Sequence, residues 1–229
     1  MLTLAVDIGG GTIKVAAFGP KGERATETLS RPTPSPATPD SVCALVRDMA
    51  GTLPPFERVS VGFPGIVKRN VTINAPNLGN ELWHRVPLGA ELGRTLGHPI
   101  RVVNDVDLQG LGVVQGEGVE LVLTLGTGMG AALFTEGVLV PNLELGHHPF
   151  RNGHTYEDLV RDTELKRIGK VEWTARVVSV LEQLEPIFNY DRLHLGGGNA
   201  RNIAAQLPSN VRLFTLEEAL RGAPKLWDD

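Results

Sequence analysis

Short apolar runs, many of them rich in β-branched residues, alternate along the chain with segments whose apolar positions follow a helical period. The apolar runs predict strands over residues 2–8, 13–18, 58–63, 100–103, 121–125, 131–134, 138–140 and 191–195. The periodic segments predict helices over residues 40–49, 87–96, 106–116, 171–187 and 199–207, with two more beginning near residues 156 and 215. This alternation is typical of an α/β fold, and we expect a largely parallel sheet in each half.

A proline-rich segment interrupts the pattern between the strand predicted over residues 13–18 and the helix predicted over residues 40–49. Residues Arg31–Pro39 include four prolines, and proline lacks the N–H that a helix or a central strand requires. We therefore expect this segment to run extended over the surface until Asp40 caps the following helix.

An internal repeat relates the two halves of the chain. Residues 4–11 can be placed over residues 121–128, and strand, glycine loop, strand, turn and strand then recur in the same order. The repeat predicts duplicated lobes that face each other across a cleft. We expect an N-terminal lobe of residues 1–104 and a C-terminal lobe of residues 105–229, whose last helix is a candidate for packing back on the first lobe. Two unrelated glycine hairpins are the alternative.

Composition narrows the class of protein. The 229 residues are 41% hydrophobic and 21% charged, with a net charge of -4, so neither a basic field for nucleic acid nor a polybasic membrane anchor is expected. The single cysteine, Cys43, excludes a disulfide framework and a cysteine-cluster zinc site. Asp7 interrupts the first apolar run, and no run approaches the roughly 20 apolar residues of a membrane helix. We expect a cytoplasmic protein.

The first glycine loop is a candidate phosphate site. Gly9, Gly10 and Gly11 follow a buried strand, and without Cβ atoms they can bring successive N–H groups close to a phosphate. Thr12 adds a hydroxyl and Lys14 a positive charge. A glycine triplet alone is weak evidence, because a simple hairpin turn has the same composition.

The second glycine loop strengthens this interpretation. Gly126, Thr127 and Gly128 occur in a matching context, which favours phosphate binding over two ordinary turns. Each loop leads into another strand rather than a helix, so neither is a P-loop or a dinucleotide fingerprint. Asp7, near the end of the first strand, is suited to holding a hydrated magnesium ion beside the phosphates.

Asp105 is the candidate catalytic base. It follows Asn104 at the end of a hydrophobic strand, where a carboxylate can accept the proton of an attacking hydroxyl in phosphoryl transfer. The alternative is a helix N-cap, which either residue can supply. Both roles are compatible if Asn104 positions the substrate. Asp107 is expected to be a first-turn residue favoured by the helix dipole.

Glu144 and His147 are candidates for binding a sugar. A carboxylate and an imidazole three residues apart can bind vicinal hydroxyls as acceptor and donor. His148 and His154 are expected to be polar loop residues. Their irregular spacing and the lack of a cysteine cluster argue against a structural zinc.

Taken together, these segments resemble the family of bacterial repressors, open reading frames and sugar kinases, the ROK family, and most closely its polyphosphate-dependent glucokinases and glucomannokinases. The similar segments cover residues 6–14, 32–39, 62–65, 74–77, 103–105, 123–128, 140–147 and 195–198. The resemblance implies an actin-like, ribonuclease H-like two-lobe fold, a magnesium-dependent transfer to the 6-hydroxyl of glucose or mannose, and a homodimer. The donor would be polyphosphate or a nucleoside triphosphate such as ATP.

The same resemblance assigns roles to individual residues. It makes Asp105 the base and places Gly196 and Gly197 on the donor side with the two glycine loops. It assigns hexose binding to Gly65, Asn77, Asn104, Glu144, His147 and Glu157.

Two departures from the family pattern concern the donor. Gly11 stands where a hydroxyl residue is usual, and Leu216–Arg221 replaces a segment of small residues that normally lines the donor pocket. Arg221 would either meet a polyanionic phosphate or be a solvated helix charge. A non-catalytic hexose-binding homologue is therefore the alternative to a kinase. A repressor of the family would need a helix-turn-helix before the first lobe, which already begins at Leu2, so that function is not expected.

Overall fold

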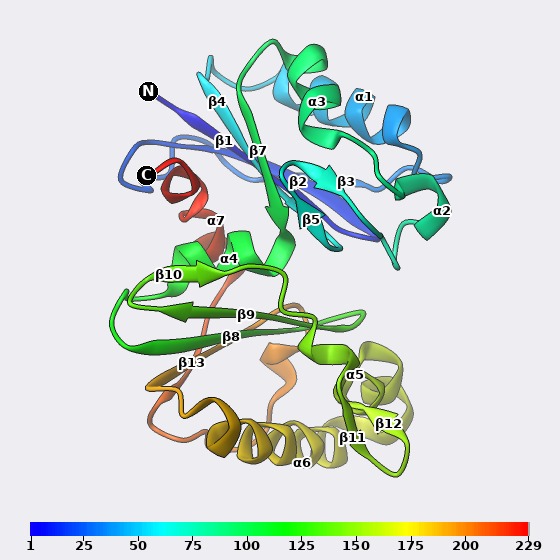
Figure 1. The fold of residues 1–229 in the computed structure, drawn as a ribbon, viewed down its shortest axis with the longest axis vertical. Helices are drawn as coiled ribbons and strands as arrows, with labels where there is room; N and C mark the ends of the chain where they lie inside the picture. The colour runs from blue at the N-terminus through cyan, green and yellow to red at the C-terminus, as the bar shows by residue number, and fades with distance from the viewer. Residues whose placement is uncertain (229) are drawn as a thin grey trace. The chain divides into compact units, whose positions relative to one another are not determined.

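The computed structural model describes residues 1–228, which pack as two units (Figure 1). Unit 1 comprises Met1–Gly112 and the C-terminal segment from Glu217, and unit 2 comprises Val113–Leu216. The boundary expected after residue 104 lies at the start of helix α4 (Asp105–Val113), whereas the packing assigns nearly all of this helix to unit 1.

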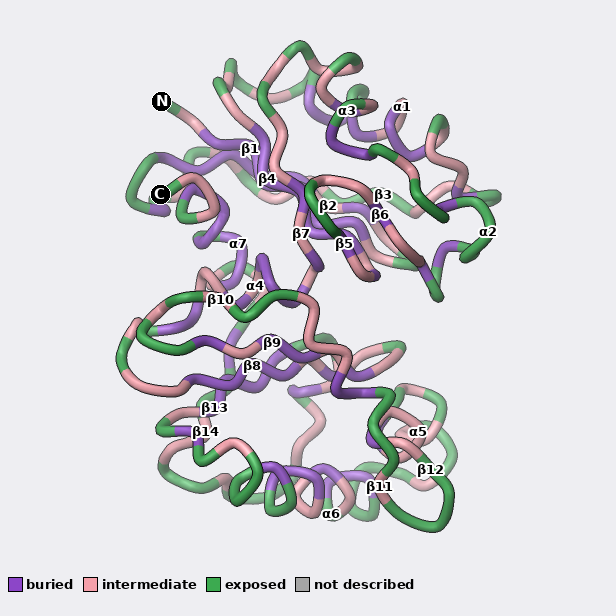
Figure 2. Tube along the Cα trace, viewed as in Figure 1, coloured by how far each residue is buried: buried purple, intermediate pink, exposed green. Residues whose placement is uncertain are grey.

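Unit 1 is built on a five-stranded mixed sheet with the order β3-β2-β1-β4-β7. Its strands are β1 (Thr3–Ile8), β2 (Thr12–Phe18), β3 (Leu29–Pro32), β4 (Arg58–Phe63) and β7 (Ile100–Asn104). The β3-β2-β1 pairs are antiparallel, and the β1-β4-β7 pairs are parallel. Helices α1 (Pro39–Ala50) and α3 (Leu88–Leu96) cover one face of this sheet, where alternate residues such as Leu4, Val6 and Ile8 are fully buried (Figures 1 and 2).

Unit 2 repeats this topology with the order β10-β9-β8-β13-β14. Its strands are β8 (Val119–Leu125), β9 (Met129–Thr135), β10 (Val138–Val140), β13 (Arg192–Gly196) and β14 (Val211–Leu213). Helix α6 (Asp162–Phe188) packs on one face through Trp173, Val177, Leu181 and Leu184, all of them buried. The same order and the same sequence of antiparallel and parallel pairs confirm the duplication.

The expectation of largely parallel sheets was wrong, because two of the four strand pairs in each sheet are antiparallel. The glycine loops and the turns that follow them are short hairpin connections, and such connections can join only antiparallel neighbours. Parallel pairing begins where a helix provides the crossover.

Several predicted elements begin or end at other residues in the structure. Thr38, not Asp40, caps α1 by accepting a hydrogen bond from the Ser41 N–H, and Asp40 lies in the first turn. Helix α6 begins at Asp162 and includes a kink at Gly169, whose φ is 79°.

The helix predicted over residues 199–207 is reduced to the 3-10 turn η2 (Ala200–Asn202). The N–H of Ala204 bonds to the hydroxyl of Thr174 on α6 instead of to a carbonyl one turn earlier. Pro208 also disfavours the helical conformation at the residue before it.

Shorter elements complete the two units. They are β5 (Val67–Lys68), β6 (Val71–Thr72), α2 (Asn80–Trp83), η1 (Leu145–His147), β11 (Pro149–Arg151), β12 (His154–Thr155), α5 (Tyr156–Val160), α7 (Leu216–Leu220) and η3 (Ala223–Trp227). Among residues 1–228, no helix has the length and apolarity that a membrane span requires.

Candidate active site

The predicted residues of unit 1 gather at the carboxyl ends of its parallel strands, which is where α/β proteins generally bind ligands. Asp7 of β1 is in register with Gly62 of β4, which is in turn in register with Val103 of β7. Asp105 follows two residues after Val103. A Cβ at Gly62 would lie 3.1 Å from the Cα of Asp105, so this glycine allows the first turn of α4 to approach the sheet. The sequence motifs did not predict this contact between Gly62 and the candidate base.

Asp7 is paired with Lys14 across the first hairpin. The two residues are directly opposite in the antiparallel register, and Lys14 Nζ lies 3.2 Å from Asp7 Oδ2. Asp7 is only 5% exposed, so the ammonium compensates a carboxylate that is almost completely removed from water. Thr12 occupies the same face of β2 as Lys14, because the two are separated by one residue.

The first glycine loop leaves N–H groups available. The Gly9 N–H donates to the Thr12 carbonyl at 3.0 Å, whereas within residues 1–228 those of Gly10 and Gly11 donate to no protein acceptor. A Cβ at Gly10 would lie 3.0 Å from the Cβ of Asn77, so the loop and this predicted sugar ligand are in close contact. The structure thus places a residue predicted to bind the phosphoryl donor next to a residue predicted to bind the sugar.

Asn104 supplies the helix cap that the sequence left undecided between two residues. Its Oδ1 accepts hydrogen bonds from the N–H groups of Val106 at 2.8 Å and Asp107 at 3.3 Å, and its Nδ2 donates to the Gly65 carbonyl at 3.2 Å. The Asp105 carboxylate accepts a hydrogen bond of 2.9 Å from the N–H of the residue that follows it. The buried Asn104 therefore fixes both the start of α4 and the position of Gly65.

The glycine loop of unit 2 lies beside the Gly196–Gly198 triplet. Gly126 donates to the Gly128 carbonyl at 3.0 Å, while within the described chain the N–H groups of Thr127 and Gly128 have no protein acceptor. Gly197 has a φ of 85°, and a Cβ there would lie 2.6 Å from the Leu125 nitrogen. The two donor-side segments thus pack backbone against backbone at the ends of the parallel strands β8 and β13.

Gly196 is restricted by a different neighbour. A Cβ on this residue would overlap the ring of Phe214, so the close packing of β13 requires glycine at this position. This contact explains the glycine without any ligand, and the donor role of Gly196 stays a prediction.

The predicted sugar residues of unit 2 converge on the start of β9. Glu157 Oε2 accepts a hydrogen bond of 3.0 Å from the Met129 N–H, and Gly128 has no room for a Cβ because this carboxylate occupies the space. Gly146, inside the Glu-Leu-Gly-His segment, packs against the Met129 backbone. His147 Nε2 lies 3.5 Å from Glu144 Oε2. Glu157 and the segment that carries Glu144 and His147 therefore both pack against the backbone at Met129.

Burial raises the pKa of the Glu144 carboxyl above its ordinary value. The neighbouring charge of Glu157 raises this pKa further, whereas His147 acts in the opposite direction. Glu144 is partly removed from water and lies near a second carboxylate. A hydrogen bond donated by a hydroxyl therefore stabilises its charged form more than it would stabilise that of an exposed carboxylate.

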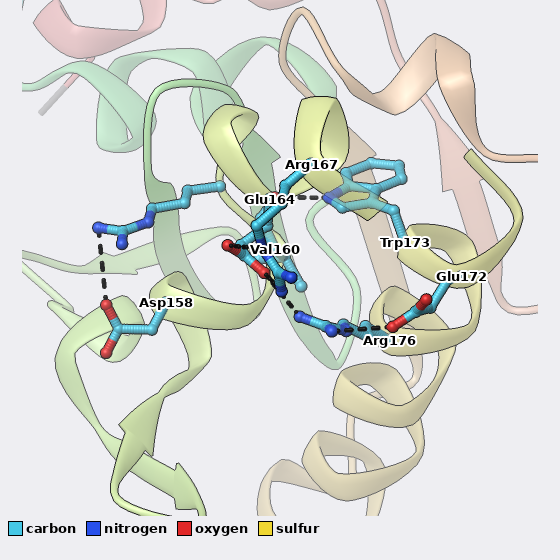
Figure 3. A network of polar contacts seen from close by, with 8 residues as sticks. Asp158, Val160, Glu164, Arg167, Glu172, Trp173 and Arg176 are labelled. Atoms are coloured by element: carbon cyan, nitrogen blue, oxygen red, sulfur yellow. Dashed lines mark hydrogen bonds and ion pairs between the residues drawn. The ribbon is translucent and has the colours of Figure 1, made fainter. Parts of the chain in front are cut away.

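A polar network braces the helix that carries Glu157 (Figure 3). Trp173 Nε1 donates to the Val160 carbonyl at 2.8 Å, which ties the end of α5 to α6. Glu164 accepts hydrogen bonds from Arg167 and from Arg176, which lie on opposite sides of the kink in α6. The hydrogen bond from Arg167 is the largest influence that lowers the pKa of Glu164, to about 2.

The C-terminal segment, where the family pattern is altered, is held by ion pairs and by packing. Arg221 lies 3.3 Å from Glu217 one turn earlier on α7, and Arg24 lies 3.4 Å from the same carboxylate. Arg221 is thus engaged on the helix surface, as expected for a solvated helix charge.

The residues present fit magnesium only as a partner of bound phosphates. Within residues 1–228 no three His, Cys, Asp or Glu side chains come together in an arrangement that could hold a metal ion. Asp7 is a single carboxylate beside a glycine loop. Mg²⁺ is commonly bound by one or two carboxylates together with phosphate oxygens and water.

Two sheets of identical topology, each with a glycine loop at the carboxyl ends of its parallel strands, define a protein of the actin-like class. Residues 3–158 match the model of the ROK family, and the chain belongs to that family. Over 215 residues it is 28% identical to the polyphosphate glucokinase of Mycobacterium tuberculosis strain H37Rv, covering 89% of this chain and 80% of that protein.

Solved structures support the same assignment. The inorganic polyphosphate/ATP-glucomannokinase from Arthrobacter sp. strain KM has a TM-score of 0.86 and 31% identity, covering 98% of this chain and 97% of that chain. A ROK family glucokinase from Streptomyces griseus, solved in complex with glucose and AMPPNP, has a TM-score of 0.83 at 18% identity and covers 99% of both chains. The second likeness bears on the fold alone. The chain is a kinase with the actin-like fold.

Proposed function

We propose that this kinase transfers a phosphoryl group from polyphosphate or a nucleoside triphosphate to the 6-hydroxyl of a hexose, with Asp105 as the general base. Its relatives identify it as an enzyme of the hexokinase and glucokinase class. Glucose is the first substrate to test and mannose the second, because the relatives named above include a glucokinase and a glucomannokinase.

The main support for the proposal is that Asn104, and not Asp105, is the residue that caps α4. Asn104 caps α4 with two hydrogen bonds, so the helix does not require the aspartate that follows it as its cap. An intermediate level of exposure leaves Asp105 accessible to a substrate. In the reaction its carboxylate accepts the proton of the 6-hydroxyl while that oxygen forms a bond to the phosphorus and the donor oxygen leaves.

We assign binding of the phosphoryl donor to the N–H groups of the two glycine loops. Charge develops on the phosphoryl oxygens during transfer, and N–H groups that are already directed outward stabilise it without reorganisation. The N–H groups of Gly10, Gly11, Thr127 and Gly128 are available for this purpose within the described chain. Asp7 would hold hydrated magnesium, which would supply neutralisation of the phosphate charge. Lys14 adds a second cation beside it.

Each unit contains candidate ligands for the hexose. In unit 1 these are Asn77, the Gly65 backbone and Asn104, whose amide nitrogen carries a second hydrogen. In unit 2 they are Glu144 and His147, which lie 3.5 Å apart, and Glu157, which accepts a hydrogen bond from the Met129 N–H.

A matrix of substrates tests the proposal. Purified protein is incubated with magnesium and glucose, mannose or an N-acetylated hexosamine, each against ATP, GTP and long-chain polyphosphate, and hexose 6-phosphate is measured. We expect product from glucose with at least one donor. The altered segment Leu216–Arg221 is the observation that favours the alternative, a non-catalytic hexose-binding protein. Glucose binding in calorimetry without product from any donor would establish that alternative.

A further inference from the structure

Thr33 contacts the first glycine loop at two points. It directly follows the edge strand β3, and its Oγ1 donates to the Gly9 carbonyl at 2.6 Å. Its own N–H donates to the Gly11 carbonyl at 3.1 Å. One residue of the proline-rich segment therefore binds the first and the last carbonyl of the three-glycine loop. Thr33 and Gly9 are 24 positions apart in the chain.

These contacts determine which way the loop directs its N–H groups. In a trans peptide the C=O of one residue and the N–H of the next point in opposite directions. When Thr33 holds the Gly9 carbonyl, the Gly10 N–H points away from Thr33, and within residues 1–228 it meets no protein acceptor. The Gly11 carbonyl orients the following N–H, that of Thr12, in the same way.

Apart from Thr33, the loop is held by the hydrogen bond from the Gly9 N–H to the Thr12 carbonyl and by the contact of Gly10 with Asn77. A Cβ at Gly11 would contact nothing within 4 Å, and both Gly10 and Gly11 are exposed. Glycines lose more conformational freedom on ordering than other residues, so a glycine loop without restraints would sample many orientations of its N–H groups. Thr33 itself is restrained, because it lies between Pro32 and Pro34 and the residue before a proline is confined to extended conformations.

We propose that Thr33 is a positioning residue for the phosphoryl donor, which fixes the first glycine loop so that its N–H groups face the donor phosphates. This inference rests on the proposed kinase function. It gives the segment Arg31–Pro39 a role in donor binding, beyond that of a surface connection.

The second glycine loop is held by different residues. The Gly126 carbonyl accepts hydrogen bonds from the Asp162 N–H at 2.9 Å and from Asn199 Nδ2 at 3.3 Å. A change at Thr33 therefore perturbs one loop and leaves the support of the other intact. The loss should appear as weaker donor binding and leave hexose binding unchanged.

The experiment compares Thr33→Val, which removes the hydroxyl and preserves the shape, with Thr33→Ser, which keeps the hydroxyl. Thr33→Ala is measured in parallel in case the valine variant does not fold. Thr38→Val is the matched control, since Thr38 lies in the same segment but caps α1 through Ser41. For each protein, KM for polyphosphate and ATP, KM for glucose, kcat and the melting temperature are measured.

We expect Thr33→Val and Thr33→Ala to raise the donor KM roughly 3- to 10-fold, the effect of one lost hydrogen bond, with the glucose KM changed less than about twofold. Thr33→Ser should keep the donor KM within about twofold of wild type. Thr38→Val should lower the melting temperature and leave both KM values unchanged.

An unchanged donor KM in Thr33→Val refutes the inference, as does an equal rise in Thr33→Ser or Thr38→Val. A wild-type protein that makes no product with any donor refutes the kinase proposal itself. The two failures are therefore distinct.

Discussion

Gly128→Ala tests whether the sugar residues of unit 2 form one site. A Cβ at this position would lie 2.8 Å from Glu157 Cδ and closer still to the carboxylate oxygen that bonds Met129. Ordinary contact begins near 3.4 Å, so the carboxylate must retreat by about 0.6 Å or more, the difference between these two distances. The hydrogen bond to the Met129 N–H, now 3.0 Å, would then be lost.

The effect on function should exceed the effect on folding. The obstacle is the end of a flexible side chain, so we expect the melting temperature to fall by only a few degrees. A misplaced carboxylate loses a charged hydrogen bond to the sugar, about 1.5–3 kcal/mol, which corresponds to roughly 10- to 150-fold in glucose affinity. Isothermal titration calorimetry with glucose measures this loss directly.

A double-mutant cycle with Glu157→Ala identifies the route of the effect. If Gly128→Ala acts through the Glu157 carboxylate, it should change glucose affinity little in the Glu157→Ala background. Fully additive losses would refute this reasoning, and so would unchanged affinity in Gly128→Ala alone.

Two further predictions concern pH and the C-terminus. Because burial and Glu157 raise the Glu144 pKa, this carboxylate takes up its proton at a higher pH than an ordinary glutamate. Glucose affinity should therefore weaken as the pH falls toward that pKa. Calorimetry between pH 4.5 and 7.5 should show this loss of affinity at acidic pH in the wild type and not in Glu144→Gln. The same loss in both proteins would contradict the assignment of Glu144 to the sugar site. Trp227 lies 5.4 Å from the Arg58 guanidinium and 4.7 Å from that of Arg101, and its Nε1 donates to Ser60 Oγ at 2.9 Å. Trp227→Ala should cost about 2 kcal/mol and lower the melting temperature by roughly 4–8 °C, with a smaller loss in Trp227→Phe, whereas an unchanged melting temperature would show that the indole does not anchor the C-terminal segment.

The sequence was sufficient for the elements whose periodicity is strong. Apolar runs located nearly every long strand, and the repeat of glycine loop and hairpin anticipated two sheets of one topology. The helix predicted over residues 199–207 failed because a tertiary hydrogen bond from Ala204 to Thr174 replaced the helical one, and no local pattern records such a partner. The two glycine hairpins were predicted, but the sheets were expected to be largely parallel because the alternation of strands and helices was weighted above these short loops.

The candidate site was predicted as a set of motifs, and its internal contacts could not be. Asn104 and Asp105 are adjacent, and the sequence alone gives both the ability to cap the helix. Only the backbone geometry of the structure shows that Asn104 is the cap. The contacts of Thr33 and Gly62 with predicted site residues could not be foreseen, because they depend on strand register and close approach. The contact of Asn199 with the second glycine loop was also missed, although its position directly after a glycine triplet could have indicated it.

The role of Asp105 in activating a hexose hydroxyl for phosphoryl transfer is tested most directly by comparing Asp105→Ala with wild type. Hexose 6-phosphate formation from glucose, magnesium and the best donor is followed by phosphorus NMR, and glucose binding is followed by calorimetry. We predict that turnover falls by roughly 10²- to 10⁴-fold, as expected for loss of a general base, while glucose still binds. Undiminished turnover in Asp105→Ala would show that Asp105 is not the general base.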